Sequence, residues 1–360
     1  MLNSLCEEHE FVVFAIKFDN PRPDRINFIR IPVPNCPLAV MFLLFHILAA
    51  TSYIAARIRG VAKFDCIQFV ESNLLFRGLV YAHFCHGTYL ERHWIETRPS
   101  GLRRFGRWLD HRLHALAEPF VLSRARKIIV PSQGLAGELG RRYPESRGRI
   151  GIIANPVDQR HFAPPPGLDR PALRRQLGLG PDRITLCFIA LGHFERKGLG
   201  LAIDAIARLA DPRVELIVVG GTPQTVMPWQ RHAERARIGH CVTFFGMQQD
   251  IRPYLWCADA FILPSFYEVY PLVGLQAAAA QVPLIATPVH GLNEFMIHRE
   301  NGLIIQPTVD SIVEAISEFL GMSAQERRAM GQAAAKSIAH CSEERFAENW
   351  RSVYREMGAA

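Results

Sequence analysis

The chain has 360 residues, of which 49% are hydrophobic and 21% are charged, and this balance excludes an intrinsically disordered protein. The length allows two domains of ordinary size, each with its own core. The net charge of +7 is unevenly placed, because residues 1–150 carry +8 and residues 151–360 carry −1. The eight cysteines form neither a C-x-x-C pair nor a Cys/His cluster with zinc spacing. We therefore expect reduced thiols in a cytoplasmic protein and no metal site.

The first half of the chain is predicted to be α/β. Its strand-like runs are residues 11–18, 66–70, 80–85, 128–131 and 150–154. No signal peptide is expected, because the first fifteen residues carry three glutamates and no basic n-region. Residues 38–56 form a long apolar run that contains His46. Since ~19 residues is at the low end for a membrane-spanning helix, we interpret this run as a buried helix, with a transmembrane span as the alternative.

A basic amphipathic helix is predicted over residues 102–120, from Leu102 to Phe120. Apolar residues recur there at spacings of three and four, and arginines occupy the rest of the helix surface. Together with the positive charge of residues 1–150, this pattern indicates either an anionic membrane surface as a partner or an ordinary solvated helix. The consecutive prolines at 164–166 are the best candidate for a linker to the second half.

Strands and helices alternate clearly in the second half. The expected strands are residues 184–191, 214–219, 242–245, 261–263, 282–287 and 303–305. Helical patterns at 199–210 and 271–280 lie between them, so a parallel sheet covered by helices on both faces is predicted. Capping-box sequences that begin at Ser311 and Ser323 predict two further helices, and residues 342–357 a last amphipathic helix.

Two cations, Arg196 and Lys197, stand between the first strand of the second half and the helix that follows it. A helix N-terminus disfavours each exposed cation by ~0.3–1 kcal/mol, and a bound anion would reverse this penalty. Gly192 and Gly198 would allow close approach of the backbone. The pattern predicts a diphosphate site, whereas the alternative is a surface charge cluster that includes Glu195.

Glu268 and His86 are the other candidate functional residues. Glu268 follows the strand at 261–263, at the sheet edge where ligands bind in open α/β sheets. The helix after it offers free N–H groups for sugar hydroxyls or phosphate, although a glutamate there can equally be a favourable partner of the helix dipole. His86 follows the strand at 80–85, where a lone histidine is commonly structural.

Taken together, the motifs of the chain resemble those of glycosyltransferase family 4, which has the GT-B fold. The matching pieces, in the family's order, are FDCIQFVES, VYAHFCHG, ARKIIVPS, IIANPVDQRHF, GHFERKG, VVGG, FFG, ADAFILPSFYEVYPLVGLQAAA, VPLIATPVHGLNEF and ENGLIIQP. The resemblance covers residues 5–355. It implies an α/β fold with two Rossmann-like domains that face each other across a cleft. These would be an acceptor-side domain over residues 1–165 and a nucleotide-sugar-binding domain over 166–340, with a C-terminal helix over 341–360 that packs back toward the first.

The resemblance also implies a reaction and the residues that carry it. The family transfers hexosyl units with retention of configuration from a nucleotide diphosphate sugar, and usually without a metal, so we expect no cofactor. Arg196 and Lys197 would stabilise the departing diphosphate, Glu268 would bind the hydroxyls of the transferred sugar, and His86 would lie near the reacting centre. The further donor-binding positions that the family implies are Gly192, Gly246, Met247, Val269, Tyr270, Pro271, Leu272 and Gln276.

Two features depart from the family pattern. Gln276 stands where the family has a second glutamate, and a neutral acceptor binds ribose hydroxyls less strongly than a carboxylate. The first strand-like run resembles the family's second strand, and residues 1–30 contain no glycine-rich loop. We therefore expect the N-terminal domain to lack its first strand. Both features support the alternative of a non-catalytic GT-B protein, either a truncated pseudoenzyme or a scaffold.

On the leading interpretation, the acceptor is a glycan or a polyprenyl-diphosphate-linked glycan in surface polysaccharide biosynthesis. The enzyme would be cytoplasmic or peripheral on the inner face of the membrane. A nicotinamide-dependent oxidoreductase is disfavoured, because no G-x-G-x-x-G turn follows a first strand. No nucleic acid partner is expected, because the basic half lacks an aromatic stacking platform. An epimerase or a phosphorylase on the same fold stays open.

Overall fold

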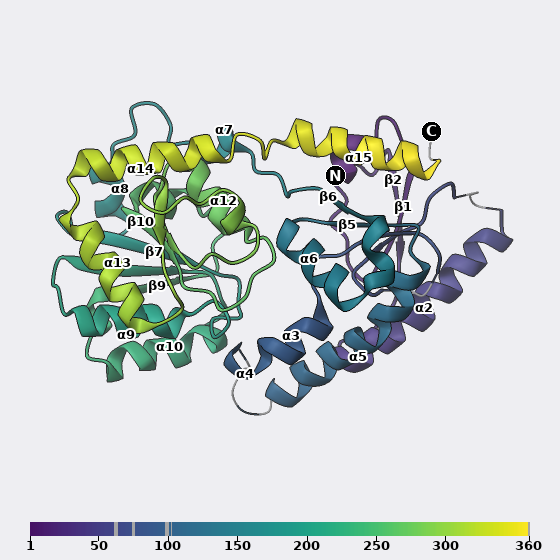
Figure 1. Cartoon of the computed structure of the whole chain (residues 1–360), viewed down its shortest axis with the longest axis horizontal. Coiled ribbons are helices and arrows are strands. Elements are labelled where there is room, and N and C mark those ends of the chain that lie inside the picture. Colours follow the sequence, from purple (N-terminus) through teal and green to yellow (C-terminus); the bar gives the residue numbers. More distant parts are fainter. Residues whose placement is uncertain (61–63, 74–75, 98–100, 102, 359–360) are drawn as a thin grey trace. The chain divides into compact units, whose positions relative to one another are not determined.

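The computed structural model describes residues 1–60, 64–73, 76–97, 101 and 103–358 (Figure 1). The chain divides into two compact units. The first contains residues of Met1–Ile95, Pro99–Ala154 and Glu343–Ala360, and the second contains residues of Glu96–Arg98 and Asn155–Ser342. The proline-rich segment 164–166 lies inside the second unit, where it connects α7 (Gln159–Phe162) to α8 (Arg170–Gln176).

The second unit is built on a six-stranded parallel sheet with the strand order β12-β11-β10-β7-β8-β9. Its strands are β7 (Ile184–Ile189), β8 (Val214–Val219), β9 (Val242–Gly246), β10 (Ala260–Leu263), β11 (Leu284–Ala286) and β12 (Gly302–Ile304). The first strand along the chain, β7, lies in the interior of the sheet, with β8 on one side and β10 on the other. The direction in which strands are added therefore reverses between β7 and β10, which makes this pair a topological switch point.

Helices cover both faces of this sheet, as predicted: α9, α10 and α13 lie on one face and α12 and α14 on the other (Figure 1). The helices of the unit, besides α7 and α8, are α9 (Leu199–Leu209), α10 (Pro223–Arg235), α11 (Arg252–Cys257), α12 (Leu272–Ala279), α13 (Val309–Gly321) and α14 (Ala324–Ser337). Every residue of β8 and β10 is buried, which explains their unbroken apolar runs. The capping box at Ser323 is confirmed. The one predicted at Ser311 is wrong, because Thr308 is the N-cap and accepts the N–H of Ser311.

The first unit holds two separate parallel sheets, a pair β1-β2 and a four-stranded sheet with the order β3-β4-β5-β6. Its strands are β1 (Phe11–Ala15), β2 (Ile26–Arg30), β3 (Gln68–Val70), β4 (Leu79–Tyr81), β5 (Lys127–Val130) and β6 (Ile150–Ile152). Its main helices are α1 (Leu2–Leu5), α2 (Leu38–Ile58), α3 (His86–Arg92), α5 (Arg103–Arg124), α6 (Gln133–Arg142) and α15 (Glu343–Met357). Strand β2 was not predicted, because it lies in a segment interrupted by prolines.

The C-terminal helix α15 completes the core of the first unit. Its Trp350 is fully buried and packs with Leu79 of β4 and Ile129 of β5. The hydroxyl of Tyr354 donates a hydrogen bond of 2.7 Å to Oε1 of Gln68, the first residue of strand β3. Residues from both ends of the chain therefore share one apolar core, and removing α15 would expose it to water.

Helix α2 differs most from the sequence-based expectation. Among the described residues it is the one helix long and apolar enough to cross a membrane, with 21 residues and a mean hydropathy of 2.1, yet only 11% of its apolar window is buried. Its buried residues are the three alanines Ala39, Ala49 and Ala56, whereas Ile47 and Ile58 are 60% and 80% exposed. The prediction of a buried helix is therefore wrong, because the buried face of α2 is a narrow row of alanines. Partly exposed side chains also contact the neighbouring elements, and the ring centroid of Phe42 lies 4.3 Å from that of His114 on α5.

Helix α5 confirms the helix predicted over residues 102–120, although Leu102 lies outside the described residues. Its orientation differs from that of an ordinary amphipathic surface helix. Phe105, Leu116 and Phe120 on its apolar side are 65%, 56% and 57% exposed. Glu118 is buried and His111 is half-buried, so polar groups point inward where α5 packs against α3.

Candidate functional site

The loops that follow β7 and β10 meet at the switch point of the six-stranded sheet, where ligands bind in open α/β sheets. The backbone N–H of Phe266 donates a hydrogen bond of 2.9 Å to the carbonyl of Arg196. Arg196 Nη1 in turn donates to the carbonyl of Tyr267 at 3.1 Å. These two bonds hold the loops together and fix the backbone from which the predicted site residues project.

Arg196, Lys197 and Glu268 form one cluster at this point. Lys197 Nζ lies 2.7 Å from Glu268 Oε1, and Arg196 Nη1 lies 3.6 Å from Glu268 Oε2. The side chains of Lys197, Arg196 and Glu268 are 13%, 15% and 9% exposed. Two cations and one carboxylate leave one net positive charge in a place largely removed from water, where charges attract each other more strongly than in bulk water. The cluster can therefore bind an anion.

Of the two glycines in the β7 loop, only Gly198 is required by the backbone. It has φ +76° and caps α9, and an added Cβ would lie 2.1 Å from the carbonyl oxygen of Pro264. Substitution would therefore separate the loop from the end of β10. Gly192 has open space around it and no left-handed φ, so the expected need for glycine at that position is not found.

The remaining predicted donor positions also follow the carboxyl ends of strands. In the loop after β10, the buried residues are Val269, Tyr270 and Pro271, while Leu272 is exposed and begins α12, and Gln276 is half-buried on α12. After the other strand, Gly246 ends β9, and Met247, which follows it, is exposed. The hydroxyl of Tyr270 lies 3.4 Å from Cys341 Sγ, so this side chain packs within the unit. Only the backbone of Tyr270 is therefore available to contact a ligand.

His86 begins helix α3, beyond the carboxyl end of β4, and is 8% exposed. Its Nδ1 lies 2.9 Å from His111 Nδ1, and its ring stacks on His114 with 4.3 Å between centroids. Burial, followed by the charges of His114 and His111, lowers the pKa of His86 well below its usual value. The imidazole is therefore neutral near pH 7, and it can donate or accept a hydrogen bond without carrying charge.

Glu118 of α5 fixes the backbone at His86 and was not found from the sequence. Its Oε1 accepts the N–H of His86 at 2.5 Å, and its Oε2 accepts the N–H of Gly87 at 3.0 Å and the hydroxyl of Tyr143 at 2.6 Å. Glu118 is 4% exposed. In the sequence, the only indication of a role for Glu118 was a glutamate within the apolar stretch that ends α5. This pattern does not predict which backbone N–H groups the carboxylate binds.

Glu71, which directly follows β3, is a second carboxyl group beside His86. Its Oε2 lies 4.0 Å from His86 Nε2, and its Oε1 accepts the N–H of His83 at 3.1 Å. Burial raises the pKa of Glu71 to about 8. The group is therefore largely protonated near pH 7. Among the described residues, no group of three or more His, Cys, Asp or Glu side chains is arranged to hold a metal ion.

Comparison with known proteins gives two family matches, which together span most of the chain. The model described as Glycosyltransferase Family 4 matches residues 1–161, and the model described as Glycosyl transferases group 1 matches residues 183–322. The alpha-maltose-1-phosphate synthase of Mycolicibacterium smegmatis is 25% identical over 333 residues, which are 86% of this chain and 84% of that protein.

Solved structures share the fold. WaaG, a glycosyltransferase involved in lipopolysaccharide biosynthesis, matches with a TM-score of 0.77 at 18% identity, covering 98% of this chain and 92% of that chain. Anabaena HepE, solved in complex with UDP-glucose, matches with a TM-score of 0.70 at 17% identity, covering 97% and 100%. The chain belongs to the group 1, family 4 glycosyltransferases of GT-B fold, and it is therefore a retaining glycosyltransferase. The predicted α/β fold and family are confirmed.

Proposed function

We propose that this enzyme transfers a hexosyl unit from a nucleotide diphosphate sugar to a glycan or lipid-linked glycan in surface polysaccharide biosynthesis. The observation that carries the proposal is the Arg196–Lys197–Glu268 cluster at the switch point. In the reaction the bond between the sugar C1 and the diphosphate oxygen breaks, and the diphosphate leaves with the electron pair. A new bond forms between C1 and an acceptor hydroxyl oxygen, and the proton of this hydroxyl passes to the departing diphosphate oxygen.

The cluster suits this reaction because Arg196 and Lys197 can exchange Glu268 for the donor diphosphate as their binding partner. Without donor, both cations are near the carboxylate of Glu268. A donor diphosphate would compete for Arg196 and Lys197, and it would free Glu268 to accept hydrogen bonds from the hydroxyls of the sugar. The cations would then stabilise the charge that develops on the leaving diphosphate, a contribution that is often the largest in catalysis.

The other predicted positions take supporting roles in the proposal. The backbone N–H groups between Val269 and Leu272 would bind the sugar and phosphates at the start of α12. Gln276 would bind the ribose hydroxyls through its neutral amide. Gly246 and Met247 would border the base. His86, neutral and held by Glu118, would serve the reacting centre through hydrogen bonding. UDP-glucose is the first donor to test, because the similar HepE structure contains it.

A thermal-shift screen of the full chain against UDP, GDP, ADP and dTDP, with and without their sugars, tests donor binding. Ligand at ~100 times its dissociation constant should stabilise the folded protein by about 2.7 kcal/mol. The shift should appear with one nucleotide and disappear in Lys197→Ala. Arg208→Ala is the matched control, because Arg208 pairs with Asp310 on the protein surface. If folded protein shows no shift with any nucleotide, the proposal fails and a scaffold role takes its place.

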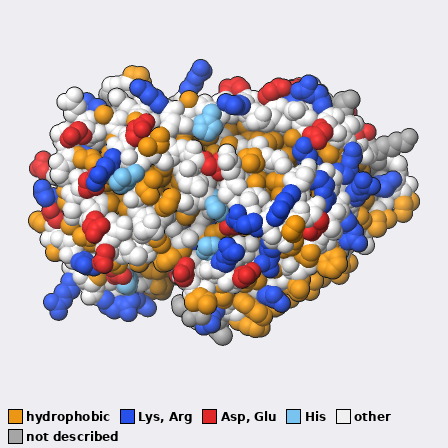
Figure 2. Space-filling model, viewed as in Figure 1, with side chains coloured by type: hydrophobic (Ala, Val, Ile, Leu, Met, Phe, Trp, Pro, Cys, Tyr) orange, Lys and Arg blue, Asp and Glu red, His pale blue; other side chains and the backbone are white. Residues whose placement is uncertain are grey.

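The exposed sides of α2 and α5 support attachment of the enzyme to an anionic membrane. Exposed apolar residues on α2 recur at helical spacing, and those on the neighbouring α5 include three aromatic side chains. They are Val40, Leu43, Ile47, Ile54 and Ile58 on α2, and Phe105, Trp108, Leu116 and Phe120 on α5. Hydrophobic side chains gather along the lower right edge in Figure 2, where Figure 1 places these two helices. The arginines of α5 complement acidic lipid headgroups.

A position in the membrane interface fits these helices better than a transmembrane span. The alanine face of α2 packs against α5, and α5 carries the exposed Arg103, Arg104 and Arg112. A span through the lipid would draw these arginines toward the hydrocarbon region, where each costs at least ~2.5 kcal/mol. Lying flat, the same helices would insert apolar side chains and leave the guanidinium groups among the headgroups.

Vesicle flotation tests the proposed membrane attachment. Wild-type protein should float with vesicles of phosphatidylcholine and phosphatidylglycerol, and binding should fall as salt is raised. The double variant Ile47→Glu/Ile54→Glu should stay in the soluble fraction. Met227→Glu is the matched control, because Met227 is an exposed apolar residue on α10, and it should float like the wild type. Equal flotation of all three proteins would contradict the proposal.

A further inference from the structure

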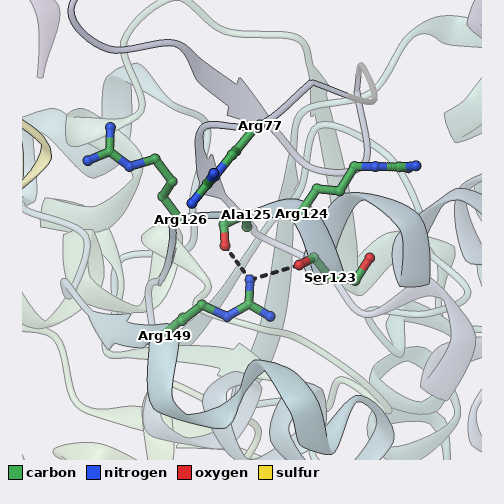
Figure 3. A pocket seen from close by; sticks show the side chains of 6 residues that line it. All are labelled: Arg77, Ser123, Arg124, Ala125, Arg126 and Arg149. Carbon is green, nitrogen blue, oxygen red and sulfur yellow. Dashed lines mark hydrogen bonds between the residues drawn. The ribbon is translucent and has the colours of Figure 1, made fainter.

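Four arginines surround a pocket at one edge of the four-stranded sheet in the first unit (Figure 3). Arg77 shortly precedes β4, Arg126 directly precedes β5, and Arg149 directly precedes β6, while Arg124 ends α5. Because the strands are parallel, their amino ends meet at the same edge of the sheet. His86 follows the carboxyl end of β4. The pocket therefore lies at the edge opposite the one that carries His86.

The charges in this arginine pocket are not balanced by carboxylates. The pocket has a volume of about 410 Å³ and is lined by Arg77, Ser123, Arg124, Ala125, Arg126 and Arg149, with no aspartate or glutamate among them. This volume is in the range of small-molecule sites, about 300–1,000 Å³. Figure 3 shows Arg77 and Arg149 reaching toward the middle of the pocket, whereas the side chains of Arg124 and Arg126 extend outward in different directions. Surface arginines commonly pair with acidic side chains, and no carboxylate lines this pocket.

The four arginines differ in how they are held. Arg149 donates from Nη1 to the main-chain carbonyls of Ser123 and Ala125, and these bonds fix its guanidinium group at one side of the pocket (Figure 3). Arg126 Nη1 donates to a main-chain carbonyl at 3.3 Å. The side chains of Arg77 and Arg124 make no hydrogen bond or ion pair with the part of the chain that the structure describes. Two guanidinium groups are therefore available to a ligand beside two that are already positioned.

We propose that the arginine pocket binds a phosphoryl group, carried either by a soluble phosphate or diphosphate or by a lipid headgroup. A guanidinium fork binds phosphate oxygens through paired, charge-assisted hydrogen bonds. A phosphate monoester carries about −1.5 to −2 near pH 7, so it balances several arginines better than a carboxylate does. Arg149 forms the fixed base of the site, Arg77 reaches toward it, and Arg124, which extends outward in Figure 3, turns inward to contact the ligand.

This site is independent of the proposed donor site. Arg196 and Lys197 belong to the second unit, whereas all the residues that line the arginine pocket belong to the first. Loss of sugar transfer would therefore leave the inference intact. A lipid source is consistent with the position of Arg124 at the end of α5, the helix whose exposed side carries Phe120. A soluble source needs no membrane, so the two sources can be separated by experiment.

Isothermal titration of the full chain with inorganic phosphate and diphosphate at low ionic strength tests the site directly. Both titrations use a Lys197→Ala background, which weakens binding at the donor site. Adding Arg77→Gln and Arg124→Gln to that background should weaken phosphate binding at least tenfold. Adding Arg141→Gln, an exposed arginine outside the pocket, should leave it unchanged. Because the side chains of Arg77 and Arg124 are exposed, these variants should fold, and far-UV circular dichroism checks this.

Two results would overturn the proposal. The first is no phosphate binding by Lys197→Ala protein, and the second is equal binding with and without the two pocket substitutions. Flotation with vesicles that contain phosphatidic acid separates the sources. If Arg77→Gln/Arg124→Gln loses both phosphate and vesicle binding, a lipid headgroup is the ligand. If it loses phosphate binding alone, the ligand is soluble.

Discussion

Replacing Lys197 with methionine removes one positive charge from the donor cluster and keeps most of the side chain's length. In the structure Lys197 Nζ lies 2.7 Å from Glu268 Oε1, and both side chains are nearly buried. Removing one partner of a buried ion pair costs about 3–5 kcal/mol when the other charge is left alone. Here Arg196 Nη1 remains 3.6 Å from the same carboxylate. We therefore expect a smaller loss in the free energy of unfolding, about 2 kcal/mol.

The same substitution should reduce catalysis by more than it reduces stability. Removing one preorganised group that stabilises developing charge typically lowers kcat by about 10²–10³-fold. Lys197→Met should therefore lower kcat/KM by a factor in that range with the donor found in the nucleotide screen. Arg208→Met, on the exposed side of the neighbouring helix α9, should retain wild-type activity.

Release of the nucleotide diphosphate, measured at a temperature where all variants are folded, gives kcat/KM for each protein. Unfolding in urea, followed by circular dichroism, gives the stability change separately. Activity of Lys197→Met within threefold of the wild type would refute the role assigned to this cation. An equal loss in Arg208→Met would show that the effect does not depend on the cluster.

Three further predictions follow from the local geometry. Gly198→Ala should lower the free energy of unfolding by more than ~2 kcal/mol, because the cost of a left-handed φ and the cost of a clash with the end of β10 add together. Gly192→Ala should be neutral or slightly stabilising, and equal losses of the two variants in urea unfolding would contradict this. Glu118→Ala should lower the free energy of unfolding by about 2–4 kcal/mol, because two buried N–H groups lose their acceptor. The imidazole NMR signals of His86 should also shift, and unchanged signals would show that Glu118 does not position His86. Glu71 has a pKa of about 8 in the folded state against 4.5 for the free side chain. Between these values the folded state retains a proton that the unfolded state releases, so the contribution of Glu71 to stability falls as pH rises from 5 to 8. Glu71→Gln should remove this contribution, and parallel stability–pH curves for variant and wild type would disprove it.

The second unit could be predicted closely from the sequence for a physical reason. Parallel strands that are buried on both faces require unbroken apolar runs, and these runs are separated by helical patterns of a different period. The predicted β8 has the bounds that the structure shows, Val214–Val219. Lys197 and Glu268 each follow a predicted strand of that sheet, and the resemblance to glycosyltransferase family 4 assigned both to one donor site.

The first unit was harder to predict because its key features depend on tertiary packing. A helix as apolar as α2 has the same sequence pattern whether it is buried in protein or exposed to lipid, and in the structure its buried residues are all alanines. The inward orientation of His111 and Glu118 depends on the packing of α5 against α3. The arginine pocket collects residues from three separate segments, and no single segment carries its signal.

The central claim is that a nucleotide diphosphate sugar binds at the switch point, with its diphosphate on Arg196 and Lys197. A crystal structure of the enzyme with the donor found in the nucleotide screen tests this claim most directly. We predict that the diphosphate oxygens lie within hydrogen-bonding distance of Lys197 Nζ and the Arg196 guanidinium group, with Glu268 turned to the sugar hydroxyls. A donor bound elsewhere, with Lys197 still 2.7 Å from Glu268, would contradict it.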